Sequence, residues 1–477
     1  MTDDAGPAPA RLPSRTDPTV WRATHMLGGA WGRHAGVGRF SWWTPVRWLL
    51  VLTTITLLFG FAQKSPCSTG DWTGNKQYTH FCYSDVIPLW SDERLDQGAV
   101  PYRDTDVEYP VLTGAFMWVT ADLTRGVHTI LGDAQELTIF GVLTSVLLAL
   151  CAYVVTIATA GAARRRPYDA AIFALSPLLL FHAFTNWDLL AMAFTAGALW
   201  AWARGKPVLA GALIGLGTAA KLYPVFLLVA IGTLALRSGK WRDTLWCTAS
   251  ALVAWLAVNL PIAFAYYDGW KTFYTFSSDR IAERSSIWAI VHTMTNGSLG
   301  DLDATPWKPS GVAVAVAVLV GMLAVVAIGM LAPVRPRLPQ LAFLAVLAFL
   351  LTTKVWSPQY SLWLVPLLAL ARPRWRLNLI WQCTEVAVWM LTLTLLLGNI
   401  DGQADHGIDY GGLVIVLILR DILLLVLAGL IVREMWCPWL DVVRVDGTDD
   451  PCGGPFDHAP DDGRLPGSRA LASGGQA

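Results

Sequence analysis

The stretch SGVAVAVAVLVGMLAVVAIGMLAP, residues 310–333, contains no charged side chain. A helix crosses the hydrocarbon core of a bilayer with about 20 consecutive apolar residues, so this stretch is long enough to span a membrane. The composition agrees, because 54% of the 477 residues are hydrophobic and only 15% are charged. A soluble domain carries about 25% charged residues. The sequence therefore predicts an all-α, polytopic membrane protein.

Further apolar stretches lie on both sides of residues 310–333, and the sequence predicts a bundle of about 12 transmembrane helices. Several of these stretches are short, and the two that flank Lys221 could instead form one long helix. The predicted spans are 46–63, 137–160, 168–184, 188–204, 207–220, 222–236, 243–265, 310–333, 340–352, 360–371, 377–397 and 412–432.

The positions of lysine and arginine predict which side of the membrane each loop occupies. Short cytoplasmic loops carry an excess of these residues. With the spans above, five basic clusters fall on one side, and both termini fall there too: Arg164–Arg166, Arg204 with Lys206, Arg237–Arg242, Arg335 with Arg337, and Arg372–Arg376. We therefore expect residues 1–45 and 433–477 to be cytoplasmic. Both are rich in Pro, Gly, Asp and Ser, so we expect them to be largely disordered.

Residues 46–432 then form the membrane core, with a large first external loop over residues 64–136. Within this loop, the apolar stretch Val111–Leu123 is too short to cross the bilayer, and we expect it to lie along the outer surface as an interfacial helix. Cys67 and Cys82 belong to the same loop. The outside is oxidising, and the other five cysteines lie in spans or in the tail, so a disulfide between these two is expected.

Ionisable residues gather on the predicted external side of the membrane. Asp188, Lys221 and Lys354 end helices there, on the same side as Asp85. Charges at membrane depth are costly and usually functional. The alternative is that each charge only reaches the interface from a helix end, and that Asp85 only caps the surface helix that follows it.

Motif content narrows the chemistry that this face can perform. The sequence contains no phosphate-binding GxxxxGK[ST] loop, no HExxH, no paired CxxC and no GxSxG elbow. It also has zero net charge and no dominant basic face, which argues against a nucleic-acid partner. No metal-ligand spacing or cofactor motif is present. What remains is a carboxylate that can act as a base, and cations that can hold a lipid phosphate. This combination favours lipid-linked glycosyl transfer.

The sequence resembles the GT-C superfamily of polytopic glycosyltransferases, and within it glycosyltransferase family 87, the actinobacterial polyprenol-phosphate-mannose-dependent mannosyltransferases. The matching stretches are SDVIPLW (84–90), GAVPYRDTDVEYPVLTG (98–114), NWD (186–188), AAKLYP (219–224) and KVWSPQY (354–360). The resemblance implies a GT-C-like bundle in the plasma membrane with an outward-facing site. It also implies transfer of a hexose, with mannose as the expected sugar, from a polyprenyl-phosphate donor to a lipid or glycan acceptor among the membrane lipids.

The resemblance also implies roles for individual residues. The family's essential acid lies shortly after the first helix, a place that only Asp85 fits with its following apolar run. A histidine assists in some members, and here His292 and His406 are both external candidates. Glu108 is expected to bind acceptor hydroxyls or to cap the helix that follows it. The expected substrate-binding set is Glu108, Tyr109, Asp188, Lys221, Arg280, Lys354, Gln359 and Tyr360.

Two alternatives stand beside these expectations. Arg280 belongs to the cluster Asp279, Arg280, Glu283 and Arg284, which could clamp a phosphate or could only pair its own charges at the surface. A 12-helix secondary transporter or lipid-carrier flippase would share the predicted topology. Transporters, however, place charged sites near the membrane midplane, whereas these charges gather at one interface.

Overall fold

A computed structural model describes Met26 and residues 42–132, 135–296, 307–400, 403–445 and 447–461. The chain divides into two units, Met1–Trp48 and Leu49–Ala477, and the account below concerns the second. No strand occurs among the described residues, which form a bundle of helices. The prediction of an all-α fold is therefore confirmed.

Within the described ranges, six helices are long and apolar enough to cross a membrane. Each coincides with one of the predicted spans, and all contain at least 20 residues: α2 (Pro45–Lys64), α6 (Glu136–Ala162), α12 (Trp241–Ala265), α15 (Gly311–Leu331), α18 (Trp375–Gly398) and α19 (Tyr410–Trp436). Their lipid-facing sides remain exposed, most of all on α15, of which only 11% of the apolar window is buried.

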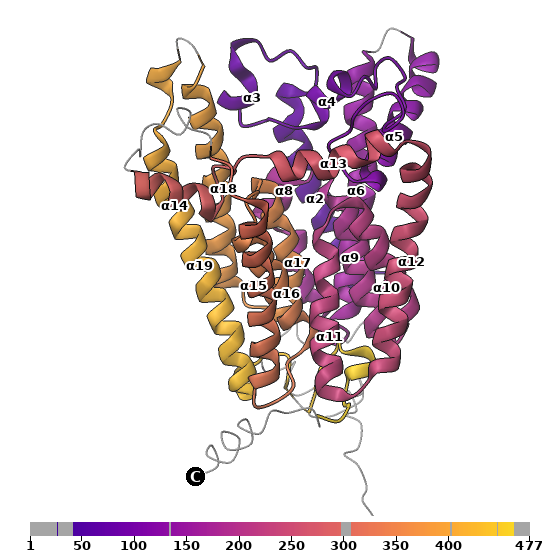
Figure 1. The fold of residues 1–477 in the computed structure, drawn as a ribbon, viewed down its shortest axis with the longest axis vertical. Helices are drawn as coiled ribbons and strands as arrows, with labels where there is room; N and C mark the ends of the chain where they lie inside the picture. The colour runs from indigo at the N-terminus through magenta and orange to yellow at the C-terminus, as the bar shows by residue number, and fades with distance from the viewer. Residues whose placement is uncertain are drawn as a thin grey trace, which may run out of the picture. The chain divides into compact units, whose positions relative to one another are not determined.

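The other predicted spans correspond to shorter apolar helices that form the interior of the bundle. Helix α9 contacts both α6 and α10, and α16 contacts both α15 and α17 (Figure 1). Since these helices are shorter than a bilayer crossing requires, the predicted count of about 12 spans is not confirmed. The helices are α9 (Asp188–Ala203), α10 (Pro207–Ala220), α11 (Leu227–Ser238), α16 (Leu338–Thr352) and α17 (Leu364–Ala371).

Two local breaks explain why the sequence pattern overestimated helix length. Predicted span 168–184 divides into α7 (Ala171–Ala174) and α8 (Pro177–His182). The Ser176 hydroxyl accepts hydrogen bonds from the amides of Leu178 and Leu179 and so starts a new helix there. At Lys221 the backbone is extended, with φ −151° and ψ 147°, so the stretches on either side are two helices and not one.

Helices of the first loop, which the sequence predicts to be external, and α13 (Tyr267–Asp279) lie at one end of the bundle. Figure 1 shows α3 (Lys76–Thr79) and α4 (Val86–Asp92) at this end, with α13 running across the bundle axis. Helix α5 (Val111–Leu131) is longer than the predicted interfacial stretch 111–123, and it contacts α6 and α10. It is not among the candidate spans of the described chain.

Cys67 and Cys82 are joined by a disulfide, and both are almost fully buried. The bond ties the end of α2 to the segment that immediately precedes Asp85.

We expect thiol reagents to leave both residues unlabelled in intact cells until a reductant is added. Mass spectrometry of the labelled peptides would check this, and labelling of either cysteine without reductant would contradict a bridged loop.

The C-terminal segment departs from the predicted disorder. The sequence predicts a disordered tail over 433–477, but α19 continues to Trp436 and residues 437–445 and 447–461 fold against the bundle. The indole of Trp202, for example, donates a hydrogen bond to the carbonyl of Gly453. The prediction is therefore wrong up to Asp461. Residues 462–477, and residues 1–45 apart from Met26 and 42–45, lie outside the described part of the chain.

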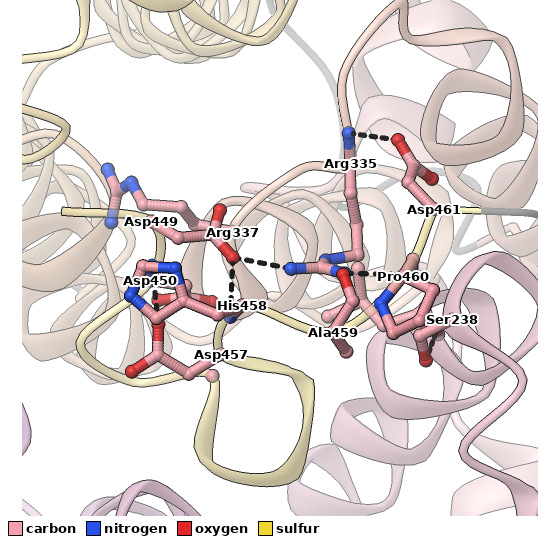
Figure 2. Close-up of polar contacts among 12 residues, drawn as sticks. Ser238, Arg335, Arg337, Asp449, Asp450, Asp457, His458, Ala459, Pro460 and Asp461 are labelled. Atoms are coloured by element: carbon pink, nitrogen blue, oxygen red, sulfur yellow. Dashed lines mark hydrogen bonds and ion pairs between the residues drawn. The ribbon is translucent and has the colours of Figure 1, made fainter. Parts of the chain in front are cut away.

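Ion pairs explain why this polar segment is ordered. Figure 2 shows Arg335 bound to carboxylates and carbonyls of the tail. Four arginines that the sequence analysis used only to predict topology form ion pairs with carboxylates of the tail. The pairs are Arg164 with Asp457, Arg237 with Asp461, Arg335 with Asp449, and Arg337 with Asp441. The expectation of disorder rested on composition alone, which does not show that these carboxylates have cationic partners elsewhere in the chain.

One group of the described tail residues has its ligand atoms close enough to hold a metal ion. These are Asp449, Asp457 and His458, whose ligand atoms lie within 4.8 Å of one another. Asp449, however, pairs with Arg335 and Arg444, and Asp457 pairs with Arg164. Since the two carboxylates already have cationic partners, we treat the group as part of the ion-pair network.

Candidate functional site

A cavity of about 950 Å³ lies at the end of the bundle that carries α13. It is bounded by residues from segments far apart in the sequence. Eight of the nine residues expected to act in catalysis or substrate binding line it: Asp85, Glu108, Tyr109, Lys221, Arg280, Lys354, Gln359 and Tyr360. The ninth, Asp188, is fully buried behind the wall.

Asp85 lies directly before α4 and is held by contacts from the α8–α9 connection. Its amide donates to the carbonyl of Thr185 at 2.8 Å, and its Oδ2 accepts a hydrogen bond from Nδ2 of Asn186 at 2.7 Å. Within the described structure, the side chain makes no capping hydrogen bond to α4, so the capping alternative is wrong.

Lys221 is buried in the cavity wall between two polar partners. Its Nζ lies 3.3 Å from Oδ1 of Asn186 and 3.7 Å from Oδ1 of Asp188. Asp188 in turn accepts a hydrogen bond from the indole of Trp363 at 2.8 Å. The sequence suggested a lysine that ends a span and extends to the membrane interface, but the side chain is only 7% exposed and points into a polar network.

Aromatic rings surround the ammonium group of Lys221. The ring centres of Tyr109 and Tyr360 lie 5.0 and 5.4 Å from Nζ, within range of a cation–π interaction. Tyr360 also stacks on Trp363 with ring centres 4.1 Å apart. These contacts restrict Lys221 to one position, with its charge facing the cavity.

Two further cations, Lys354 and Arg280, line the cavity. Lys354 donates from Nζ to the carbonyl of Ser278 at 2.8 Å, and Arg280 lies 3.7 Å from Glu283. Arg280 therefore pairs with an acid of its own cluster, as the surface-pairing alternative expects. It also lines the cavity, and its side chain is 39% exposed. Lys354 and Arg280 can thus both contact an anionic ligand.

The remaining wall of the cavity is apolar. It is built mainly by α15 with contributions from aromatic side chains: Phe226, Phe273, Phe276, Val314, Val318, Leu319, Met322 and Phe349. Leu319 lines the cavity and is 57% exposed. The apolar wall thus belongs to the candidate span that is least buried inside the bundle, with only 11% of its apolar window buried.

Burial perturbs two acids, Glu93 and Glu108, that follow Asp85 in the sequence. Burial raises the pKa of Glu108 above its ordinary value, and the Arg280 guanidinium partly offsets this rise. Burial likewise raises the pKa of Glu93 to about 7, and the carboxylate of Glu108 adds to the shift. Glu93 itself is almost fully buried in this segment of the chain.

A pH dependence of stability follows from Glu93. Because its pKa is about 7 in the folded protein and ordinarily 4.5, the folded state binds more protons between these values. Its stabilising contribution is therefore fully present below the ordinary pKa and is lost as the pH rises through about 7. We expect Glu93→Gln to flatten the dependence of Tm on pH between 5 and 8, measured in detergent. An unchanged slope would contradict the assignment.

Several residues of the site were not identified from the sequence. Tyr83, Asn186 and Trp363 all line the cavity, as does Glu283, which the sequence indicated only as a member of the charge cluster around Arg280. Asn186 belongs to the NWD stretch (186–188) that carries the family resemblance and contains Asp188, so the sequence could have identified it. Neither His292 nor His406, the two histidines expected to assist, is among the described residues that line the cavity.

Comparison with known proteins gives the family. A sequence comparison with curated proteins found no significant match. The family model for glycosyltransferase family 87 matches residues 108–358, more than half of the chain. The match includes Glu108, Lys221, Arg280 and Lys354, whereas Asp85 precedes it. The chain belongs to glycosyltransferase family 87 and is a membrane glycosyltransferase.

Proposed function

We propose that this protein transfers a hexose, with mannose as the candidate sugar, from a polyprenyl-phosphate donor to a lipid or glycan acceptor. The reaction takes place at the outer face of the cytoplasmic membrane. One observation carries the proposal: a single cavity holds the Asp85 carboxylate, the cations Arg280 and Lys354, and an apolar wall on α15. These are the groups needed for a base, a phosphate and a prenyl chain.

The cavity suits a donor that is part lipid and part anion. The exposed side of Leu319 gives the prenyl chain a route from the bilayer into the cavity along α15. Its phosphate would then lie beside Arg280 and Lys354, since guanidinium and ammonium groups donate strong hydrogen bonds to phosphate oxygens. The sugar would extend from this position toward Asp85.

The transfer needs one proton acceptor and one stabilised leaving group. The acceptor hydroxyl oxygen bonds to the anomeric carbon as the bond from that carbon to the phosphate oxygen breaks. The hydroxyl proton passes to Asp85. Polyprenyl phosphate leaves with the electron pair of the broken bond, and Arg280 and Lys354 stabilise the negative charge that develops on it.

The location of the cavity supports an outward-facing site. Gly311, at the start of α15, lines the cavity, whereas Arg335 follows the opposite end of the same helix. Arginine-rich connections mark the cytoplasmic side of a membrane protein. The site is therefore separated from cytoplasmic nucleotide sugars, and a lipid-linked sugar is the donor class that fits.

The proposal can be tested with membranes that contain the full chain. Radiolabelled polyprenyl-phosphate mannose should transfer its label to lipid or glycan, and membranes that carry Asp85→Asn should not. A polyprenyl-phosphate glucose donor tests the sugar, and a short-chain, water-soluble donor tests the apolar wall. Equal use of the short-chain donor would contradict prenyl binding along α15, and no transfer to any acceptor class would contradict the proposed reaction.

A further inference from the structure

Asn186 connects the two charged groups at the centre of the cavity. It lies between α8 and α9 and is only 2% exposed. Its Nδ2 donates to Oδ2 of Asp85 at 2.7 Å and to the hydroxyl of Tyr109 at 2.9 Å. Its Oδ1 accepts from the amide of Trp187 at 2.6 Å and from Lys221 at 3.3 Å. Every hydrogen-bonding direction of the amide is therefore in use near the base.

The surrounding charges determine the orientation of the Asn186 amide. The oxygen faces the Lys221 ammonium and a backbone N–H, both of which are donors only. The nitrogen faces the carboxylate of Asp85, which accepts hydrogen bonds only when ionised. A flipped amide would place oxygen against carboxylate and nitrogen against ammonium. Neither pair could form a hydrogen bond.

We propose that Asn186 is a positioning residue that holds Oδ2 of Asp85 and leaves Oδ1 free for the acceptor hydroxyl. This inference rests on the proposed function, in which Asp85 is the base. A carboxylate that is free to rotate would present either oxygen at varying angles, whereas a base must lie within hydrogen-bond reach of the proton that it removes. The Asn186 contact fixes which oxygen of Asp85 does so.

A positioning role predicts a specific kinetic signature. Loss of the Asn186 contact should lower kcat, because Asp85 then adopts the productive orientation less often, while KM for the lipid donor stays near its parent value. A purely structural role would instead lower the amount of folded protein and leave both constants of the folded fraction unchanged.

Asn186→Leu removes the amide with little change in volume and provides the test. We expect kcat to fall about 10–100-fold, since a hydrogen bond to a charged group is lost. KM for the lipid donor should change less than about twofold. Asn186→Asp, which replaces the donating NH2 group with an oxygen, should lower kcat at least as much.

Asn259→Leu is the matched control. Asn259 is another buried amide of the same chain: it lies in α12, bonds to Trp255 and Trp270, and lies outside the cavity lining. We expect this variant to lower Tm without lowering kcat per amount of folded protein. A similar loss of kcat in both variants would assign the Asn186 effect to general destabilisation and would overturn the inference.

The outcomes separate this inference from the function on which it rests. If Asp85→Asn is inactive and Asn186→Leu keeps the parent kcat, Asp85 remains the base and only the positioning role fails. If Asp85→Asn retains turnover, the assignment of the base itself fails. A lowered kcat with a nearly unchanged KM in Asn186→Leu, with Asp85→Asn inactive, supports both.

Discussion

Asp85→Asn is expected to lower the rate of glycosyl transfer about 10²–10⁴-fold, the usual contribution of a positioned general base. The variant should still fold, because the amide oxygen of the substituted side chain can accept the hydrogen bond that Asn186 now donates to Oδ2 of Asp85. That amide cannot accept the proton of the acceptor hydroxyl. The loss of activity is measured as turnover of radiolabelled donor in membranes with matched protein amounts. The retained fold is measured as Tm in detergent.

Asp92→Asn and Asp96→Asn are the matched controls for that experiment. Both acids are exposed, follow Asp85 in the same external segment, and lie outside the described cavity lining. They should retain turnover near the parent rate. If Asp85→Asn behaves like these controls, the base lies elsewhere, and Glu108, which also lines the cavity, becomes the leading candidate.

The long helices were predictable because hydrophobicity alone determines them. Residues 310–333 and 137–160 contain enough apolar residues to cross a bilayer, and helices occur at both places. The interior was harder to predict. Span 168–184 appeared continuous, but the Ser176 cap and the missing N–H of Pro177 divide it. Such local hydrogen bonding does not change the average hydropathy of a stretch.

Most ionisable residues of the cavity could be predicted to belong to one site, because ionisable groups at membrane depth are rare. The sequence could not show which of them contact one another. The sequence placed Lys221 and Asp188 on one face, but only the fold shows that Asp188 neutralises Lys221 from behind the wall. Asn186 carries no charge, so an argument from charge alone passed over it, although it contacts both Asp85 and Lys221. The ordered tail was missed for a similar reason, since its carboxylates pair with distant arginines.

Lys221→Met should destabilise the protein strongly, contrary to what a surface lysine would do. Asp188 is 0% exposed, and removal of the ammonium would leave its carboxylate as a buried charge without its cationic partner. Breaking a buried ion pair in this way costs about 3–5 kcal/mol. Because the single variant changes folding and the cavity together, its activity alone cannot show what the lysine does.

The double variant Lys221→Met with Asp188→Asn separates these effects. Asn at position 188 carries no charge, and its oxygen can still accept the Trp363 indole N–H. We expect Tm to recover most of the loss while donor use stays weak, since no ammonium faces the cavity from this position. Lys354→Met is the comparison, because that lysine donates to a backbone carbonyl and its removal leaves no buried acid. A double variant with parent donor kinetics would show that Lys221 serves only to neutralise Asp188.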